Sequence, residues 1–188
     1  MSKGFVIMAQ GLDYVKCANV LKDSIIKVMP NINVTIVTTD MLPYGDQAPD
    51  TNWKLQNDWQ VYEASPYDET IKLEADMIIP RNIEHWFDVM SIKDVVVCSK
   101  IRNFKNEISD VRVYRRFIDD NNLPDVYNGL MYFRYTQEST DFFKYAEQIF
   151  RNWNEIRDTI LLNCRDDNPT TDVVYAIAAK ILGVEKCT

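Results

Sequence analysis

Two acidic residues, Glu74 and Asp76, flank a single alanine directly after a strand-like run at residues 70–73. Two like charges at the edge of a protein core are costly unless a partner neutralises them. A hard divalent cation such as Mg²⁺ or Mn²⁺ would do so, because carboxylate oxygens are its usual ligands, and it could also bridge to phosphates. The pair therefore predicts a metal site, while an acid-x-acid turn that faces solvent remains the alternative.

Three further positions, Asn128, Gly129 and Asp172, could contact a ligand. Asn128 and Gly129 precede an apolar run. The amide could bind ligand hydroxyls while the glycine lets the ligand approach the backbone, although Asn-Gly also marks an ordinary turn. Asp172 lies in the first turn of the last expected helix. There it either complements the helix dipole or points into the site as a base or ligand anchor.

The loop after the first expected strand contains Gly11 and Tyr14. A lone glycine allows a tight turn. The absence of a GxGxxG or P-loop lysine motif disfavours a Rossmann dinucleotide site and a Walker NTPase. Tyr14 could stack on a base, or it could be the first core residue of the helix that follows.

Strand-like apolar runs alternate along the chain with helix-like repeats. Strands are expected at residues 5–8, 34–38, 70–73, 95–98 and 130–133. The first helix is expected to be capped by Asp13, and the last to run from near Thr171 to a cap at Gly183. This alternation predicts an α/β fold with a mostly parallel central sheet and helices on both faces. Such folds usually bind ligands at the carboxyl ends of their strands.

The composition suits one globular domain, residues 1–188, because 46% of the residues are hydrophobic. Four cysteines without CxxC spacing and a single histidine argue against a zinc site. The sequence opens without a signal peptide, and no apolar stretch approaches the roughly 20 residues that span a bilayer. We therefore expect a cytoplasmic protein without a membrane span.

The net charge of −7 argues against a dedicated duplex-binding protein, because phosphate contacts need a basic excess. One segment, residues 100–116, is an exception with six basic and two acidic residues. Its basic residues are Lys100, Arg102, Lys105, Arg112, Arg115 and Arg116. A solvated surface explains most such segments, but an anionic partner such as a diphosphate or a nucleic acid would also fit.

Taken in order, these pieces resemble the GT-A glycosyltransferases, most nearly their family 8-like members. Residues 8–14 (MAQGLDY) resemble the donor-binding loop, and residues 65–76 (SPYDETIKLEAD) resemble the segment leading into the DxD motif. Residues 128–133 (NGLMYF) resemble the strand that lines the sugar pocket, and residues 170–172 (TTD) the start of the last conserved helix. The sequence is also similar to glycosyltransferase-like proteins of bacteriophages, which would place it in the host cytoplasm.

The resemblance implies a single Rossmann-like GT-A domain that takes a nucleotide-diphosphate sugar, most often a UDP-sugar, together with Mn²⁺ or Mg²⁺. Asp76 would ligate the metal directly, and Glu74 would contact the ribose or reach the metal through water. Lys54 is placed like a family lysine that reaches the donor. The nucleoside would be held by Ala9, Gln10, Gly11 and Tyr14. The transferred sugar and the acceptor would lie among Asn128, Gly129 and Asp172, with Asn128 and Asp172 as the catalytic candidates.

Two departures from the family pattern leave alternatives open. Glu74 replaces the first Asp of DxD, and the metal-ligating His that the family often has beyond its last helix is absent, since His85 precedes that helix. A C-terminal portion of the domain could be missing. A non-catalytic nucleotide-sugar-binding module is therefore one alternative. A nucleotidyltransferase is another, although residues 8–14 lack the basic, glycine-rich loop it needs. The acceptor would be a saccharide or, through residues 100–116, a modified base in DNA.

Overall fold

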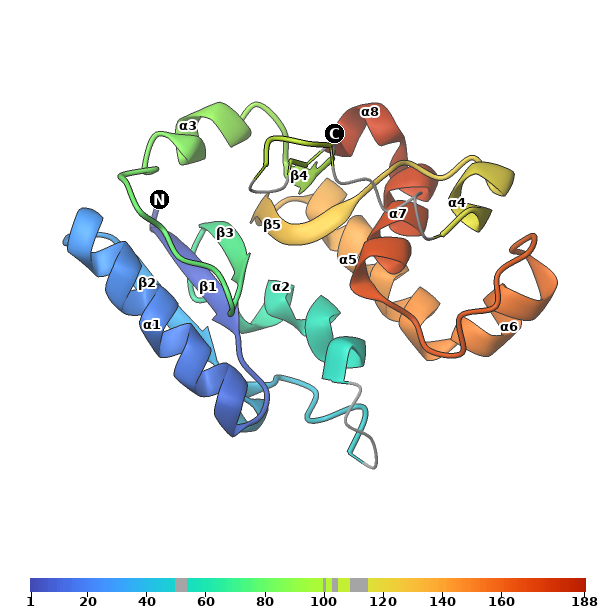
Figure 1. Cartoon of the computed structure of the whole chain (residues 1–188), viewed down its shortest axis with the longest axis horizontal. Coiled ribbons are helices and arrows are strands. Elements are labelled where there is room, and N and C mark those ends of the chain that lie inside the picture. The colour runs from blue at the N-terminus through green and yellow to red at the C-terminus, as the bar shows by residue number, and fades with distance from the viewer. Residues whose placement is uncertain (50–53, 100, 103–104, 109–114) are drawn as a thin grey trace.

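The computed structural model describes residues 1–49, 54–99, 101–102, 105–108 and 115–188 (Figure 1). Strands and helices alternate through most of these residues. In chain order they are β1 (Lys3–Met8), α1 (Leu12–Val28), β2 (Asn33–Val37), the 3-10 helices η1 (Thr39–Met41) and η2 (Lys54–Gln60), α2 (Val61–Ala64), β3 (Glu69–Glu74), α3 (Trp86–Met90), β4 (Val95–Cys98), α4 (Phe117–Asp120), β5 (Tyr127–Arg134), α5 (Gln137–Arg151), α6 (Trp153–Thr159), α7 (Thr171–Leu182) and α8 (Val184–Cys187).

The five strands form one sheet in the order β2-β1-β3-β5-β4. β1 pairs in parallel with both β2 and β3, whereas β5 pairs antiparallel with β3 and with β4. Four strands therefore share one direction and β5 runs against them. Met8 pairs with Glu74, and Leu73 pairs with Leu130. The carboxyl ends of β1 and β3 consequently meet the amino end of β5 at one edge of the sheet.

Side chains alternate between two hydrophobic clusters, one on each face of the sheet. In β1, Val6 belongs to one cluster, while Phe5 and Ile7 belong to the other. The first cluster includes residues of α2, α5, α7 and α8, and the second includes residues of α1 and α3. Figure 1 shows α1 beside β1 and β2, with α5 and α7 on the opposite side. The predicted α/β fold, with a mostly parallel sheet and helices on both faces, is confirmed.

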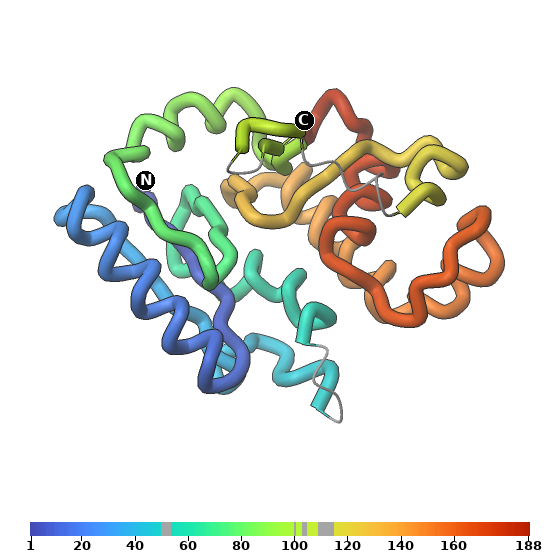
Figure 2. The backbone as a smooth tube through the Cα atoms, viewed as in Figure 1, coloured from blue at the N-terminus to red at the C-terminus, as the bar shows by residue number. Residues whose placement is uncertain are grey.

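Contacts between distant segments tie the ends of the chain to this sheet. Lys3 of β1 lies 3.3 Å from the carboxylate of Asp88 in α3, and Figure 2 shows the N-terminus beside the segment that leads to α3. Lys93, just before β4, donates a 2.8 Å hydrogen bond to the carbonyl oxygen of Glu185 in α8. Among the residues that the structure describes, no helix has the length and apolar character needed to cross a membrane.

The start of α1 differs from the sequence prediction. Gly11, not Asp13, occupies the N-cap position, with φ 97°, and Asp13 lies in the first turn. A left-handed φ of this kind strains any residue with a Cβ, so the glycine is what allows β1 to turn directly into the helix. Tyr14 is 60% exposed, which excludes the alternative that it is the first core residue of this helix. At the other end of the chain, Gly183 caps α7 with φ 112°, as predicted.

Candidate functional site

A cavity of about 300 Å³ lies at the edge of the sheet where β1 and β3 end and β5 begins. We call it the edge cavity. It is lined by Met8, Gln10, Tyr14, Lys54, Leu55, Asp58, Lys72, Leu73, Glu74, Ala75, Asp76 and Asn128. Six predicted site residues therefore come together from four separate segments. The antiparallel direction of β5 is what brings Asn128 to the same edge as Glu74.

The acidic pair has one half-buried and one exposed member. Glu74 accepts a 3.3 Å hydrogen bond from the hydroxyl of Tyr127, while Asp76 faces solvent. Burial raises the pKa of Glu74, and the carboxylates of Asp58, Asp172 and Asp76 raise it further, against the opposing effect of Lys72. Burial and the charge of Glu74 raise the pKa of Tyr127 to about 12, so the phenol stays protonated and remains a hydrogen-bond donor.

The carboxylates of Glu74 and Asp76 fit a divalent cation whose remaining ligands come from the substrate and from water. Within the described part of the chain, no group of three or more His, Cys, Asp or Glu side chains is arranged to hold a metal. Two carboxylates are nevertheless enough for Mg²⁺, which is usually bound by one or two of them together with substrate phosphates and water. The excess of negative charge around Glu74 is also what a cation would relieve.

The lining of the edge cavity contains a buried ion pair, Lys72 with Asp58, that was not predicted from the sequence. The ammonium of Lys72 lies 2.6 Å from Oδ2 of Asp58, and the two side chains are only 1% and 7% exposed. The same ammonium donates a 2.9 Å hydrogen bond to Oδ1 of Asn128. The hydroxyl of Tyr175 in α7 donates to Asp58 at 2.8 Å. This network connects η2, β3, β5 and α7, and it holds the side chain of Asn128 in one orientation.

Asn128 is fixed a second time through its backbone. Its N–H donates a 2.7 Å hydrogen bond to Oδ1 of Asp172, in the first turn of α7. Burial raises the pKa of Asp172, while the hydrogen bond from Asn128 and the charges of Arg115 and Lys72 act in the opposite direction. Because Lys72 occupies Oδ1 of Asn128, the amide nitrogen is the group of this side chain left to bind a ligand; it has no hydrogen bond to any described residue.

Lys54 and Gln10, two polar residues predicted to reach the donor, form hydrogen bonds with protein groups. The ammonium of Lys54 lies 2.6 Å from Oδ2 of Asp46 and 2.6 Å from the carbonyl oxygen of Ala48. Gln10 accepts a 2.7 Å hydrogen bond from Asn57 and donates one to the carbonyl oxygen of Lys54. Both side chains line the cavity, but in this conformation they mainly shape its wall.

The remaining predicted site residues lie around the cavity rather than in its lining. Ala9 is buried and donates a backbone hydrogen bond to Val37 at 2.9 Å. Gly11 caps α1. Asp172 accepts a hydrogen bond from Asn128, which lines the cavity. Gly129 packs under Tyr127: a Cβ at this position would come within 2.2 Å of that ring. The glycine therefore makes room for the tyrosine that donates to Glu74.

The basic segment is described only in part. Arg115 lies 3.0 Å from Asp166, and Arg102 donates to the carbonyl oxygen of Asn106 at 2.7 Å. Lys100 and Arg112 lie outside the described residues. The anion-binding role predicted for residues 100–116 stays a prediction.

The raised pKa of Glu74 leads to a testable effect on stability. A carboxyl group whose folded pKa is raised stabilises the fold below its unfolded pKa of about 4.3, and this contribution is lost as the pH rises through the folded pKa. In metal-free buffer, Glu74→Gln should therefore be more stable than wild type at pH 7, by about 0.5–2 kcal/mol, and the difference should vanish near pH 4. Urea unfolding at both pH values measures it.

Glu63→Gln is the matched control, because Glu63 is exposed on α2. Its effect should stay within about 0.5 kcal/mol at either pH. A Glu74→Gln protein that is less stable than wild type at pH 7 would show that the hydrogen bond from Tyr127 to the carboxylate outweighs the cost of burying the charge.

Comparison with known proteins gives no match to a protein-family model and none to a curated protein sequence. Solved structures do match. The apo structure of the bifunctional glycosyltransferase WbbM superposes with a TM-score of 0.56 at 13% identity, over 80% of this chain and 34% of that one. Apo GlyE, a glycosyltransferase of Streptococcus pneumoniae TIGR4, gives 0.55 at 9% identity, over 100% and 45%.

The galactosyltransferase LgtC, in complex with donor and acceptor sugar analogues, gives a TM-score of 0.55 at 9% identity, over 81% of this chain and 66% of that one. This chain thus spans from about a third to about two thirds of the length of these structures. The likeness establishes the fold: a Rossmann-like α/β domain of the kind that glycosyltransferases use.

Proposed function

We propose that this protein transfers a sugar from a nucleotide-diphosphate sugar, with UDP-sugars as the first candidates, to a hydroxyl acceptor, using Mg²⁺ or Mn²⁺. The observation that supports this is the edge cavity itself: Glu74, Asp76 and Asn128 line one cavity in a fold shared with glycosyltransferases. The sequence resemblance assigns the same three residues to the donor site.

Each side chain has a role that follows from its position. Asp76 is exposed and free to turn toward a cation, while Glu74, held by Tyr127, would support the same ion or the ribose. A bound divalent cation would stabilise the charge that develops on the leaving diphosphate. Tyr14, exposed at the rim of the cavity, offers its ring to the base. The amide nitrogen of Asn128 would donate to the transferred sugar.

A second candidate is a nucleotide-sugar-binding module that lacks turnover. One observation favours it: the described residues supply two carboxylates rather than a full metal site. A nucleotidyltransferase has less support, because the turn after β1 carries one glycine and no basic residue. A saccharide acceptor, a DNA-base acceptor, a cytoplasmic location and a relation to phage proteins remain predictions.

Titration with UDP-glucose, UDP-galactose and UDP-N-acetylglucosamine, with and without Mn²⁺, tests the donor and metal assignments. We expect at least one donor to bind with an affinity that Mn²⁺ increases. Asp76→Ala should remove this increase and weaken binding at least about tenfold, as loss of a metal-binding group typically does. Isothermal titration calorimetry measures both effects.

Asp23→Ala provides the control, because Asp23 is an exposed acid in the middle of α1 that does not line the edge cavity and has no hydrogen bond or ion pair to any described residue. It should bind donors as wild type does. If none of the three donors binds, or if the binding affinity depends on neither Mn²⁺ nor Asp76, the proposed function is wrong.

A further inference from the structure

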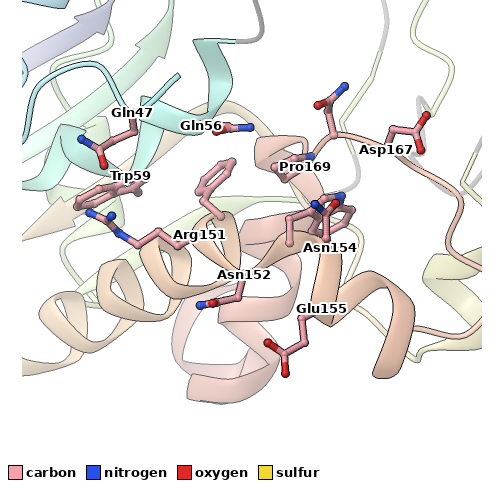
Figure 3. Close-up of a pocket in the computed structure, with 12 residues that line it drawn as sticks. Gln47, Gln56, Trp59, Arg151, Asn152, Asn154, Glu155, Asp167 and Pro169 are labelled. Atoms are coloured by element: carbon pink, nitrogen blue, oxygen red, sulfur yellow. The ribbon is translucent and has the colours of Figure 1, made fainter. Parts of the chain in front are cut away.

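A second cavity, about 600 Å³ in volume, lies outside the site described above. Figure 3 shows its lining residues, which come from η2, from the junction of α5 and α6, and from the segment before α7. Five of them are side-chain amides, so we call it the amide cavity. The amides are Gln47, Gln56, Asn152, Asn154 and Asn168. The volume falls within the range of about 300–1,000 Å³ that is usual for small-molecule sites.

Three of these amides are free to bind a ligand. The side-chain amides of Gln56, Asn154 and Asn168 make no hydrogen bond to any residue within the described ranges. Gln47 and Asn152 donate through their amide nitrogens to backbone carbonyl oxygens, of Tyr44 at 2.6 Å and Gln148 at 2.8 Å, which leaves their amide oxygens available. The cavity therefore presents both donors and acceptors at several points, because each free amide carries one of each kind.

The charges of the cavity disfavour the anionic groups that the edge cavity would take. Its lining contains one cationic side chain, Arg151, against the two carboxylates of Glu155 and Asp167, of which Asp167 lies 3.5 Å from Arg157 outside the lining. Arg151 is itself paired with Glu147 at 2.9 Å, and its guanidinium lies 5.5 Å from the ring centroid of Trp59. A phosphate would meet a net negative lining, and an apolar ligand would leave the amides without partners. A neutral molecule with many hydroxyl groups satisfies both conditions.

Both cavities are lined in part by residues of η2, although no single residue lines both. Gln56 lines the amide cavity and Asp58 lines the edge cavity, and the two lie two residues apart on η2, about 4 Å along a 3-10 helix. Pro169 lines the amide cavity three residues before Asp172, a span of at most about 11 Å. Buried Asn57 joins the two sides: it donates to Gln10 at 2.7 Å and accepts from the backbone N–H of Gln47 at 2.8 Å.

We propose that the amide cavity binds the acceptor, and that the acceptor is a neutral saccharide built from hexopyranoses. The role of this saccharide as the acceptor rests on the proposed glycosyl transfer, whereas the binding of a saccharide to the amide cavity does not. Vicinal hydroxyls each donate and accept a hydrogen bond, which matches the free amides of Gln56, Asn154 and Asn168. Because η2 lines both cavities and the segment before α7 leads to Asp172, the saccharide is placed with its reacting hydroxyl toward Asp172.

Saccharide binding is measured without any donor present. Saturation-transfer NMR uses the methyl pyranosides of glucose, galactose, mannose and N-acetylglucosamine, together with lactose and maltose, as probes. At least one probe is expected to bind the wild-type protein. The double variant Gln56→Ala/Asn154→Ala should bind it at least about tenfold more weakly, which is the loss expected for one or two hydrogen bonds. Neither side chain bonds to another described residue, so folding should be retained, as a thermal melt would confirm.

Gln137→Ala is the matched control: it removes an exposed amide at the opposite end of α5, and should bind the probe like wild type. The inference is overturned if no probe binds, or if the double variant binds as tightly as the control. Failure of the proposed function looks different: no UDP-sugar binds in the donor titration, while saccharide binding persists. If donors bind but the saccharides do not, only the assignment of the amide cavity fails.

Discussion

Replacing Lys72 by methionine is expected to lower the free energy of unfolding by about 3–5 kcal/mol, the usual effect of removing one partner from a buried ion pair. The ammonium of Lys72 lies 2.6 Å from Oδ2 of Asp58, and the lysine side chain is 1% exposed. Methionine fills most of the lysine volume, so the main cost is a buried carboxylate whose one remaining hydrogen-bond donor among the described residues is the hydroxyl of Tyr175. Urea unfolding monitored by circular dichroism measures the difference.

Two further variants separate this effect from a general loss of packing. Lys72→Met combined with Asp58→Asn removes the uncompensated charge and keeps an acceptor for Tyr175, so it should be more stable than Lys72→Met alone. Lys3→Met removes a lysine from the exposed pair with Asp88 and should cost less than about 1 kcal/mol. If Lys72→Met costs no more than Lys3→Met, the buried pair does not stabilise the fold.

The same lysine explains why Asn128 is suited to binding a ligand. An amide side chain alone rotates freely, and its oxygen and nitrogen offer opposite hydrogen-bonding character. Here the ammonium of Lys72 holds the oxygen at 2.9 Å, and the carboxylate of Asp172 holds the backbone N–H at 2.7 Å. The amide nitrogen is therefore presented in a fixed direction, which lowers the entropic cost of binding.

The architecture could be predicted from the sequence because the apolar pattern is strong. The strand expected at residues 70–73 lies within β3, and the helix expected from near Thr171 is α7. The direction of β5 could not be predicted. Asn128 lies at the amino end of its strand, so in an all-parallel sheet it would lie at the opposite edge from Glu74. Only the antiparallel pairing of β5 with β3 brings the two residues together.

The charged network was missed because each member looks ordinary in sequence. Lys72 stands in an otherwise strand-like run, where a lysine is easily interpreted as facing solvent. One signal was present: residues 70, 72 and 74 share a face of the strand, so Lys72 must project to the same side as Glu74. Its partner Asp58 precedes the apolar residues Trp59 and Val61, and pairing across 14 residues depends on tertiary packing that no local pattern encodes.

Two residues predicted to bind the donor make contacts within the protein that the sequence did not indicate. Gln10 and Lys54 were assigned to the ligand by resemblance, yet their polar groups bind Asn57 and Asp46. A short 3-10 helix such as η2 leaves backbone and side-chain groups that need partners, and these two residues supply some of them. In this structure they support η2, whose residues line both the edge cavity and the amide cavity, and their contact with the donor stays a prediction.

Replacing Asp172 has the largest effect expected on catalysis. If Asp172 acts on the acceptor or the transferred sugar, Asp172→Ala should reduce the release of UDP from a UDP-sugar by about 10²–10⁴-fold, the range for loss of a general acid or base. Donor affinity, measured separately by calorimetry, should change far less, because Asp172 lies behind Asn128 rather than in the lining of the edge cavity. Steady-state UDP release at saturating donor measures the loss.

Asp172→Asn separates chemistry from positioning. Its side-chain oxygen can still accept the hydrogen bond from the backbone N–H of Asn128, so a purely positioning role predicts nearly normal UDP release. A role that needs the negative charge predicts that Asp172→Asn is about as slow as Asp172→Ala. Because burial raises the pKa of Asp172, wild-type activity should then increase with pH through a value above that of an ordinary aspartate. UDP release that neither substitution changes would exclude Asp172 from the reaction. Absence of UDP release from the wild-type protein would instead favour the binding module without turnover.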